Sequence, residues 1–312
     1  LSISRSSFDW GIQVPWDPSH VVYVWFDALL NYVTATGWGS DDAEFERRWP
    51  AVHIVGKDIA RFHAVIWPAM LIAAGLPVPK TVFGHGWLLV GGEKMSKSKL
   101  TGIAPSQITD VFGSDAFRYY FLSAITFGQD GSFSWEDLAA RYQAELANGF
   151  GNLASRVISM VATYYDGVVP SPGALTTDDL VTITAAATAT REANEAIERF
   201  APDAAIAAIR KLVDALNLYV TEQQPWSIAK DPEQRERLAT VLSTAIRGVG
   251  ALAILLSPVV PKATARLWAA LGADGDVEAV NILDAGAFDG AGNTVTPLDP
   301  PLFPRVETLE QA

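Results

Sequence analysis

The first candidate for chemistry is a lysine-rich loop that follows Gly91-Gly92. The loop consists of Lys94, Met95, Ser96, Lys97 and Ser98. A lysine is a compact point charge on a flexible stem, so two lysines in one loop can follow negative charge onto a departing pyrophosphate. Most lysine-rich loops are only solvated, but this string is expected by chance in roughly one in ten thousand chains of this length. The pattern therefore favours a function in phosphate chemistry.

A second candidate lies where two apolar runs end. Gly56 and Asp58 follow one run, and Gly84 and His85 follow the other. A glycine allows the backbone to approach a ligand closely, and a carboxylate can accept from ribose hydroxyls or pair with an ammonium group. The alternative is an ordinary strand–turn–helix, in which Asp58 caps the helix and His63 packs in the core.

A third candidate is an aromatic group near the start of the chain. Trp25-Phe26-Asp27-Ala28 is followed by Tyr32. Burial in a hydrophobic core is the usual fate of such residues and is the alternative here.

A fourth candidate is polar and lies in the second half of the chain. Asn148, Asn152 and Arg156 are spaced four apart, which predicts that they share one face of a helix. A solvated polar face is the alternative for a lone helix. Trp226 follows Pro225, and it is expected either to offer a stacking surface or to form an apolar wedge between helices.

An α/β pattern in the first ninety residues must position the first three groups. Residues 21–26, 51–55, 81–83 and 87–90 are predicted strands, the first of them buried. Helices are predicted to about residue 36 and from Asp58 to Gly75, with a kink at Pro68. This alternation indicates a parallel sheet with crossover helices, in which ligands bind beyond the carboxyl ends of the strands.

Helical spacing dominates the second half of the chain. Apolar residues recur every three or four positions within 146–160, 206–220 and 238–252, and residues 262–271 form a short final helix. Residues 167–177 are a predicted loop. These stripes predict a helix bundle, and the last forty residues are expected to be loop or an extended return strand.

Composition narrows the class of protein. The chain has 312 residues, 49% of them hydrophobic, which suits two domains. It contains no cysteine, so disulfides and thiolate metal sites are excluded. The net charge of −12 argues against a broad phosphate-binding surface, so a nucleic-acid contact would have to be local. No apolar run reaches the roughly 20 residues that span a bilayer, and no signal peptide is evident.

These motifs resemble the methionyl-tRNA synthetases, a family of class I aminoacyl-tRNA synthetases. The string from Lys94 to Ser98 matches the KMSKS loop of that class, and the resemblance runs through nearly the whole chain. It implies a Rossmann-like α/β fold, the second half of a catalytic domain, followed by an all-α anticodon-binding bundle. The implied domains are 1–90 for the catalytic half, 91–140 for the KMSKS loop and stem-contact segment, 141–275 for the bundle, and 276–312 for a peptide that returns to the catalytic domain.

The resemblance also implies roles for individual residues. The catalytic residues would be Lys94 and Lys97. The implied ATP site is Gly56, Asp58, His85, Gly86, Leu88, Lys94, Met95, Ser96, Lys97 and Ser98. The implied methionine pocket is Trp25, Ala28, Tyr32, Ile59, Phe62, His63 and Trp67. The implied anticodon contacts are Asn152, Arg156, Pro225 and Trp226.

The implied chemistry suits these side chains. A thioether is polarizable and gains from aromatic contact, and a tyrosine hydroxyl can donate weakly to sulfur. An exposed tryptophan can stack on an unpaired base while asparagine and arginine read its edge. The expected partners are L-methionine, ATP with Mg²⁺ and tRNA(Met), for a cytoplasmic monomer without a membrane segment or a metal site in this chain.

The sequence departs from the family pattern at its beginning. It lacks an initiator methionine, the HIGH motif and the zinc-binding insertion, so it is expected to be part of a longer protein and poorly active alone. One alternative is another class I synthetase, for leucine, isoleucine, valine or cysteine. Another is a non-catalytic tRNA-binding fragment that retains the fold.

Overall fold

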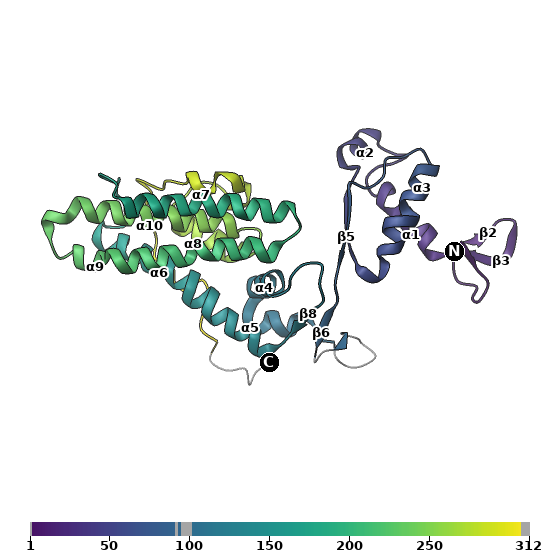
Figure 1. Ribbon diagram of the computed structural model, residues 1–312, viewed down its shortest axis with the longest axis horizontal. Helices are drawn as coiled ribbons and strands as arrows, with labels where there is room; N and C mark the ends of the chain where they lie inside the picture. The colour runs from purple at the N-terminus through teal and green to yellow at the C-terminus, as the bar shows by residue number, and fades with distance from the viewer. Residues whose placement is uncertain (1, 91–92, 95–101, 307–312) are drawn as a thin grey trace. The chain divides into compact units, whose positions relative to one another are not determined.

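The chain divides into two compact units, Leu1–Trp87 and Leu88–Ala312. The computed structural model describes residues 2–90, 93–94 and 102–306. Figure 1 labels the elements of both units, and the first unit is α/β while the second is mostly helical. The predicted succession of an α/β part and an all-α part is therefore confirmed.

A small antiparallel sheet begins the first unit. Its strands are β1 (Ser4–Arg5), β2 (Gln13–Val14) and β3 (Asp17–Val22), in the order β1-β3-β2. The predicted buried strand 21–26 is wrong, because β3 ends at Val22 and helix α1 (Val24–Thr34) starts two residues later. Leu29 and Val33 lie four apart and are both fully buried. This helical spacing outweighs the strand preference of the preceding valines.

The parallel pairing that was predicted occurs between β4 (Val52–Gly56) and β5 (Thr81–His85). Val52 lies opposite Thr81, and Gly56 lies opposite His85, so both carboxyl ends share one edge. The buried core of this unit is small. It consists of three aliphatic and two aromatic residues: Leu29, Val33, Leu71, Trp49 and Trp67.

The segment between β4 and β5 is not the single helix that was predicted. It contains the 3₁₀ turn η1 (Lys57–Ile59), the π-helix η2 (Phe62–Ile66) and α3 (Trp67–Ala73), and α2 (Asp42–Arg48) precedes β4. Asp58 does not cap this segment, since Gly56 is the N-cap and no side chain bonds there. Pro68 lies in the first turn of α3, where its missing N–H is tolerated. Gly75 ends the helix at φ 72°.

A second small sheet begins the other unit, in the order β7-β6-β8. The strands are β6 (Leu88–Val90), β7 (Glu93–Lys94) and β8 (Gly131–Phe133), of which β6 and β8 are parallel. Helix α4 (Pro105–Ser123) is kinked at Gly113, whose φ of 81° no helix allows. Helix α5 (Trp135–Arg141) follows β8.

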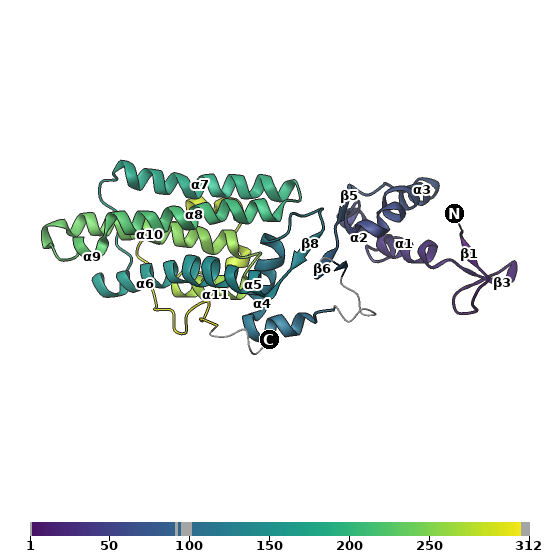
Figure 2. The same ribbon diagram turned by 60° about the horizontal axis from the view of Figure 1, so that its bottom comes forward.

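A bundle of long helices forms the core of the second unit. Its elements are the π-helix η4 (Tyr142–Gly151), α6 (Asn152–Tyr164), α7 (Thr177–Glu198), α8 (Pro202–Gln223), α9 (Pro225–Ile228), η5 (Pro232–Gln234), α10 (Arg235–Leu256) and α11 (Pro261–Ala270). Helices α7, α8 and α10 pack side by side (Figures 1 and 2). The predicted bundle is confirmed. The sequence pattern did not predict α7, because the buried face of this helix consists of small residues such as Ala186, Ala189 and Ala193 and not of large apolar ones.

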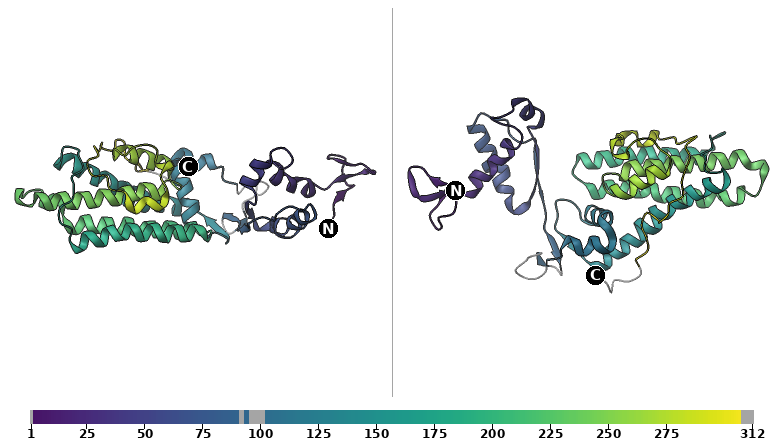
Figure 3. Two further views of the ribbon diagram at one scale, coloured as in Figure 1. Left: turned by 90° about the horizontal axis from the view of Figure 1, so that it is seen from above. Right: turned by 180° about the vertical axis from the view of Figure 1, so that it is seen from behind.

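The C-terminal segment follows the outside of the bundle. The 3₁₀ turns η6 (Val277–Ala279) and η7 (Ile282–Ala287) are short, and η7 lies against α7 and α10 (Figure 3). Further on, Leu302 and Phe303 are buried, and Tyr142 Oη donates to Pro304 O at 2.6 Å. This peptide packs on the helical unit, and its predicted return to the catalytic domain stays a prediction.

Residues Pro232–Leu256 are long and apolar enough to cross a membrane by length and composition alone. Within the helical unit, however, 94% of the most apolar stretch is buried. The apolar surface of α10 is therefore already covered by neighbouring helices, as in a core helix.

Candidate functional site

The start of α1 at Val24 has a direct consequence for the aromatic group. Trp25, Ala28 and Tyr32 are spaced three and four apart, so the helix places them on one face. A strand through residue 26 would have separated Trp25 from the other two. The structure thus brings together three residues of the predicted pocket for a reason that the sequence interpretation missed.

The π-helix η2 packs its aromatic side chains against this face of α1. The rings of Phe62 and Trp25 stack with centroids 4.7 Å apart at 15°. His63 is fully buried, and its ring lies edge-on to Trp25 at 5.8 Å and to Tyr32 at 5.6 Å. A π-turn widens the helix and is frequent at functional sites. Here it directs two consecutive side chains, Phe62 and His63, toward the same face of α1.

The hydrogen bonds of His63 determine which ring nitrogen carries the proton. Nδ1 lies 3.0 Å from Ile59 O, and a carbonyl can only accept, so Nδ1 is protonated. Nε2 lies 2.9 Å from the Tyr32 hydroxyl oxygen. The Tyr32 hydroxyl that was expected to face a thioether is therefore hydrogen-bonded to His63 in this structure.

A second histidine, His53, lies on β4 and contacts the same group of aromatic side chains. Trp67 Nε1 donates to His53 Nε2 at 3.2 Å, and the His53 ring lies 4.3 Å from that of Tyr32. Burial, and then the neighbouring His63, lower the pKa of His53 and favour the neutral ring that this bond requires. The sequence interpretation did not include His53. The alternation of the strand gave no signal for it, because apolar Val52 and Ile54 were the side chains expected to be buried, and in the structure they are exposed.

The predicted nucleotide residues of the first unit gather at one edge of the parallel pair. Gly56 and His85 are opposite each other at the ends of β4 and β5. A Cβ at Gly56 would lie 2.6 Å from Asp58 Oδ1, so a larger residue would displace this carboxylate from its observed position. His85 Nδ1 lies 2.8 Å from Gly86 O, and the Lys57 ammonium lies 4.3 Å above the Trp87 ring. The edge combines a carboxylate, imidazole and glycine backbone.

The remaining predicted ATP residues belong to the second unit. Leu88 is the first residue of β6, and Lys94 ends β7. Met95, Ser96, Lys97 and Ser98 lie outside the described residues.

The predicted anticodon residues lie on two elements of the helical unit. Asn152 and Arg156 are on α6, and Pro225 and Trp226 form the start of α9. Asn148 belongs to the π-helix η4, so the predicted spacing of four does not give it a simple α-helical face. Its Oδ1 accepts from Gln143 Nε2, five residues earlier, at 3.0 Å.

The polar residues on α6 face different surroundings. Asn152 is exposed and lines a hollow of about 350 Å³ together with Asn148, Ser155 and Arg305. Arg156 instead donates from Nη2 to Asn217 Oδ1 on α8 at 3.2 Å, and burial lowers the pKa of its guanidinium. Trp226 is 38% exposed, which leaves part of the indole open. Asn217 is a further polar residue that the sequence interpretation missed.

Two family models match the chain. The model described as tRNA synthetases class I (M) matches residues 1–158, and the model described as the anticodon binding domain of methionyl tRNA ligase matches residues 169–297. The chain therefore belongs to the class I tRNA synthetases, in the family denoted (M).

The relatives of the chain include proteins named as methionine–tRNA ligases. A methionine–tRNA ligase of Streptomyces coelicolor is 52% identical over 98% of this chain and 59% of the relative, and that of Caldanaerobacter subterraneus is 44% identical over 100% and 49%. A solved Mycobacterium tuberculosis methionyl-tRNA synthetase in complex with methionyl-adenylate has a TM-score of 0.90 at 40% identity. The match covers 98% of this chain and 60% of that protein. This chain thus spans about half to three fifths of the length of the proteins it matches.

Proposed function

We propose that this chain acts in methionine–tRNA ligation. The reaction activates L-methionine with ATP to methionyl-adenylate and pyrophosphate, then transfers the methionyl group to tRNA(Met). The observation that carries the proposal is the likeness, over 98% of the chain, to a synthetase solved with methionyl-adenylate. We propose that the protein works as a cytoplasmic monomer.

The aromatic cluster of the first unit supports methionine as the amino acid. Trp25, Phe62 and Trp67 offer aromatic faces and edges, which suit a polarizable thioether. Ala28, Tyr32, Ile59 and His63 complete the proposed pocket. Because the Tyr32 hydroxyl is hydrogen-bonded to His63 in this structure, contact of this hydroxyl with the methionine sulfur would require it to reorient.

The edge formed by Gly56, Asp58 and His85 supports a nucleotide beside this pocket. Asp58 would accept from ribose hydroxyls, and the backbone from His85 to Leu88 would approach the adenine. The methionine carboxylate would attack the α-phosphate in line, while Lys94 and Lys97 stabilise the leaving pyrophosphate. No side chain need act as a nucleophile.

Mg²⁺ would enter with ATP. Among the residues that the structure describes, no group of three His, Asp or Glu side chains is placed to hold a metal ion. Magnesium commonly keeps its waters and binds substrate phosphates, so the ion would be held mainly by the phosphates of ATP.

The helical unit supports recognition of the anticodon. Asn152 and the half-exposed Trp226 offer an amide edge and a stacking surface, and Arg156 adds a guanidinium. These groups suit the unpaired bases of a CAU anticodon. A synthetase for leucine, isoleucine, valine or cysteine would share the lysine loop but not this combination of pocket and anticodon residues. A non-catalytic tRNA-binding fragment would bind the tRNA without forming adenylate.

The test is amino-acid-dependent exchange of pyrophosphate into ATP. We suggest measuring it on this chain alone and on a chimera in which the chain replaces the matching part of the Streptomyces coelicolor relative. Exchange by the chimera with methionine, and not with leucine, isoleucine, valine or cysteine, is the expected result. Exchange with another of these amino acids would disprove the pocket assignment. Binding of tRNA(Met) without any exchange would favour the non-catalytic alternative.

A further inference from the structure

A single backbone hydrogen bond closes the turn that carries Trp226. Helix α8 ends at Gln223, and Gln224 has φ 47° and ψ 57°, a left-handed conformation that side chains other than glycine rarely adopt. In the two-bond (Schellman) form of the left-handed helix ending, the amide of the next residue also returns to a carbonyl of the last turn. That residue here is Pro225, which has no N–H. Gln224 N donates to Val220 O at 3.2 Å, but the second bond of such an ending cannot form.

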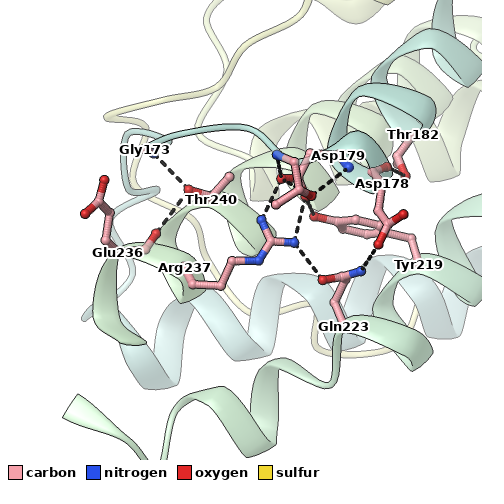
Figure 4. A network of polar contacts seen from close by, with 10 residues as sticks. Gly173, Asp178, Asp179, Thr182, Tyr219, Gln223, Glu236, Arg237 and Thr240 are labelled. Atoms are coloured by element: carbon pink, nitrogen blue, oxygen red, sulfur yellow. Dashed lines mark hydrogen bonds and ion pairs between the residues drawn. The ribbon is translucent and has the colours of Figure 1, made fainter. Parts of the chain in front are cut away.

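Side chains from two neighbouring helices hold the last residue of α8 instead. Gln223 Oε1 accepts from Arg237 Nη2 of α10 at 2.6 Å. Gln223 Nε2 donates to Asp178 Oδ2 of α7 at 3.1 Å. The amide therefore bridges α7 and α10, and both bonds are drawn in Figure 4.

Arg237 is itself fixed by a buried carboxylate. Its Nη1 and Nη2 lie 2.6 Å and 3.0 Å from the two oxygens of Asp179. Asp179 has no exposed surface and also accepts from Tyr219 Oη and from the backbone N–H of Thr176. A guanidinium held in this fork cannot turn away from Gln223 without leaving a buried charge poorly paired.

This arrangement controls the element that presents the indole. Helix α9 has only four residues, Pro225 is buried, and α9 packs on α10, the helix that carries Arg237. Ser227 N and Ile228 N donate to Gln224 O at 2.7 Å and 3.2 Å, so the position of α9 depends on the position of Gln224. Any fraying at Gln223 would therefore displace Trp226.

We propose that Gln223, clamped between Arg237 and Asp178, is a positioning residue for Trp226 in anticodon recognition. The inference rests on the proposed function, in which Trp226 stacks on an anticodon base. Gln223 itself does not touch the RNA. It fixes the left-handed turn so that the indole is already oriented when the base arrives, and less ordering is needed on binding.

The experiment is a double-mutant cycle on RNA binding. The probe is a fluorescent RNA hairpin with a CAU loop, and its dissociation constant is measured by anisotropy for this chain and for Gln223→Ala, Trp226→Ala and the double variant. Trp226→Ala should weaken binding about tenfold or more, the range of one lost stacking contact. Gln223→Ala should weaken it about threefold to tenfold. In the Trp226→Ala background, Gln223→Ala should have no further effect, because nothing remains to be positioned.

A conservative variant and a control separate positioning from general stability. Gln223→Glu keeps the acceptor for Arg237 but replaces the donor to Asp178 by a carboxylate that repels it, so it should recover only the part of the lost affinity that depends on Arg237. Asn194→Ala removes a comparable amide–carboxylate bond to Glu198 on α7, and it should leave binding unchanged. Each variant is melted in parallel, so that a loss of folding is recognised.

The outcomes distinguish this inference from the function on which it rests. If Trp226→Ala leaves binding unchanged, the proposed anticodon role of Trp226 is wrong and the positioning role falls with it. If Trp226→Ala weakens binding and Gln223→Ala does not, only the positioning role is wrong. Independent, multiplying effects of the two substitutions would also overturn it.

Discussion

Arg237 and Asp179 join α10 to α7 through a two-pronged ion pair. The Nη1–Oδ2 and Nη2–Oδ1 distances are 2.6 Å and 3.0 Å (Figure 4). Burial alone would raise the pKa of the Asp179 carboxyl. The hydrogen bonds from Arg237, Tyr219 and Thr176 outweigh burial and lower this pKa to about 2. The two helices are therefore held together by a carboxylate that is charged at all but very acid pH.

The stability of the helical unit in acid should depend on the ion pair between Arg237 and Asp179. Because the folded pKa lies below the ordinary value of 3.8, the stabilisation is complete above about pH 4 and is lost as the pH falls toward 2. A shift of this size corresponds to about 2 kcal/mol. Asp179→Asn should lower the free energy of unfolding near pH 7 by about 3–5 kcal/mol, since it leaves Arg237 without a charged partner.

Urea unfolding followed by circular dichroism between pH 2 and 7 measures both effects. The variant should also lose stability less steeply than the wild type between about pH 4 and 2. Equal slopes for the two proteins in that window would show that Asp179 does not contribute to the acid transition.

The close approach of α8 and α10 depends on Gly248. A Cβ at this position would lie 2.3 Å from Leu216 Cδ2 and 2.7 Å from its Cδ1, and Leu216 is fully buried. Alanine favours a helix by about 1 kcal/mol over glycine, but overpacking a core costs about 1–3 kcal/mol. Gly248→Ala should therefore reduce the free energy of unfolding. In a Leu216→Ala background the same change should be neutral or stabilising, and a loss in both backgrounds would contradict this account of the packing.

Tyr32→Phe tests the amino-acid pocket. The substitution removes the hydrogen-bond partner of buried His63 Nε2, which costs about 1–3 kcal/mol when no other partner is available. In the chimera, the KM for methionine in pyrophosphate exchange should rise about tenfold or more, whereas the KM for ATP should stay within about twofold. Tyr23→Phe, in the same unit, is the matched control. A change in both KM values would indicate a general disturbance of the unit.

Lys97→Ala tests the lysine loop, whose residues from Met95 to Ser98 lie outside the described part of the chain. Loss of one positive charge at the leaving pyrophosphate should slow adenylate formation by about 10²–10³-fold. Lys80→Ala, an exposed lysine in the first unit, should have no such effect. A rate for Lys97→Ala within about threefold of the wild type, or roughly 0.7 kcal/mol, would show that the role is wrong.

The sequence by itself determined the class of fold and the residues to examine. The apolar runs that became β4 and β5, the stripes of α8 and α10, and the five-residue lysine string are local patterns. Local patterns survive folding because side-chain periodicity and turn chemistry act over a few neighbouring residues. They were therefore sufficient to predict parallel strand pairing, a helix bundle and the family, although the predicted sheet of several strands is a two-stranded pair, β4 and β5.

The tertiary structure decided how those residues face one another. Periodicity could not place the start of α1 at Val24, because Val21 to Phe26 fit a strand as well as a helix until Leu29 and Val33 are buried. It could not give the π-turn at Phe62, nor the bond between His53 and Trp67, which lie 14 residues apart. The clamp on Gln223 joins it to side chains that lie 14 and 45 residues away in the sequence. Such contacts depend on the packing of whole elements, which no local pattern encodes.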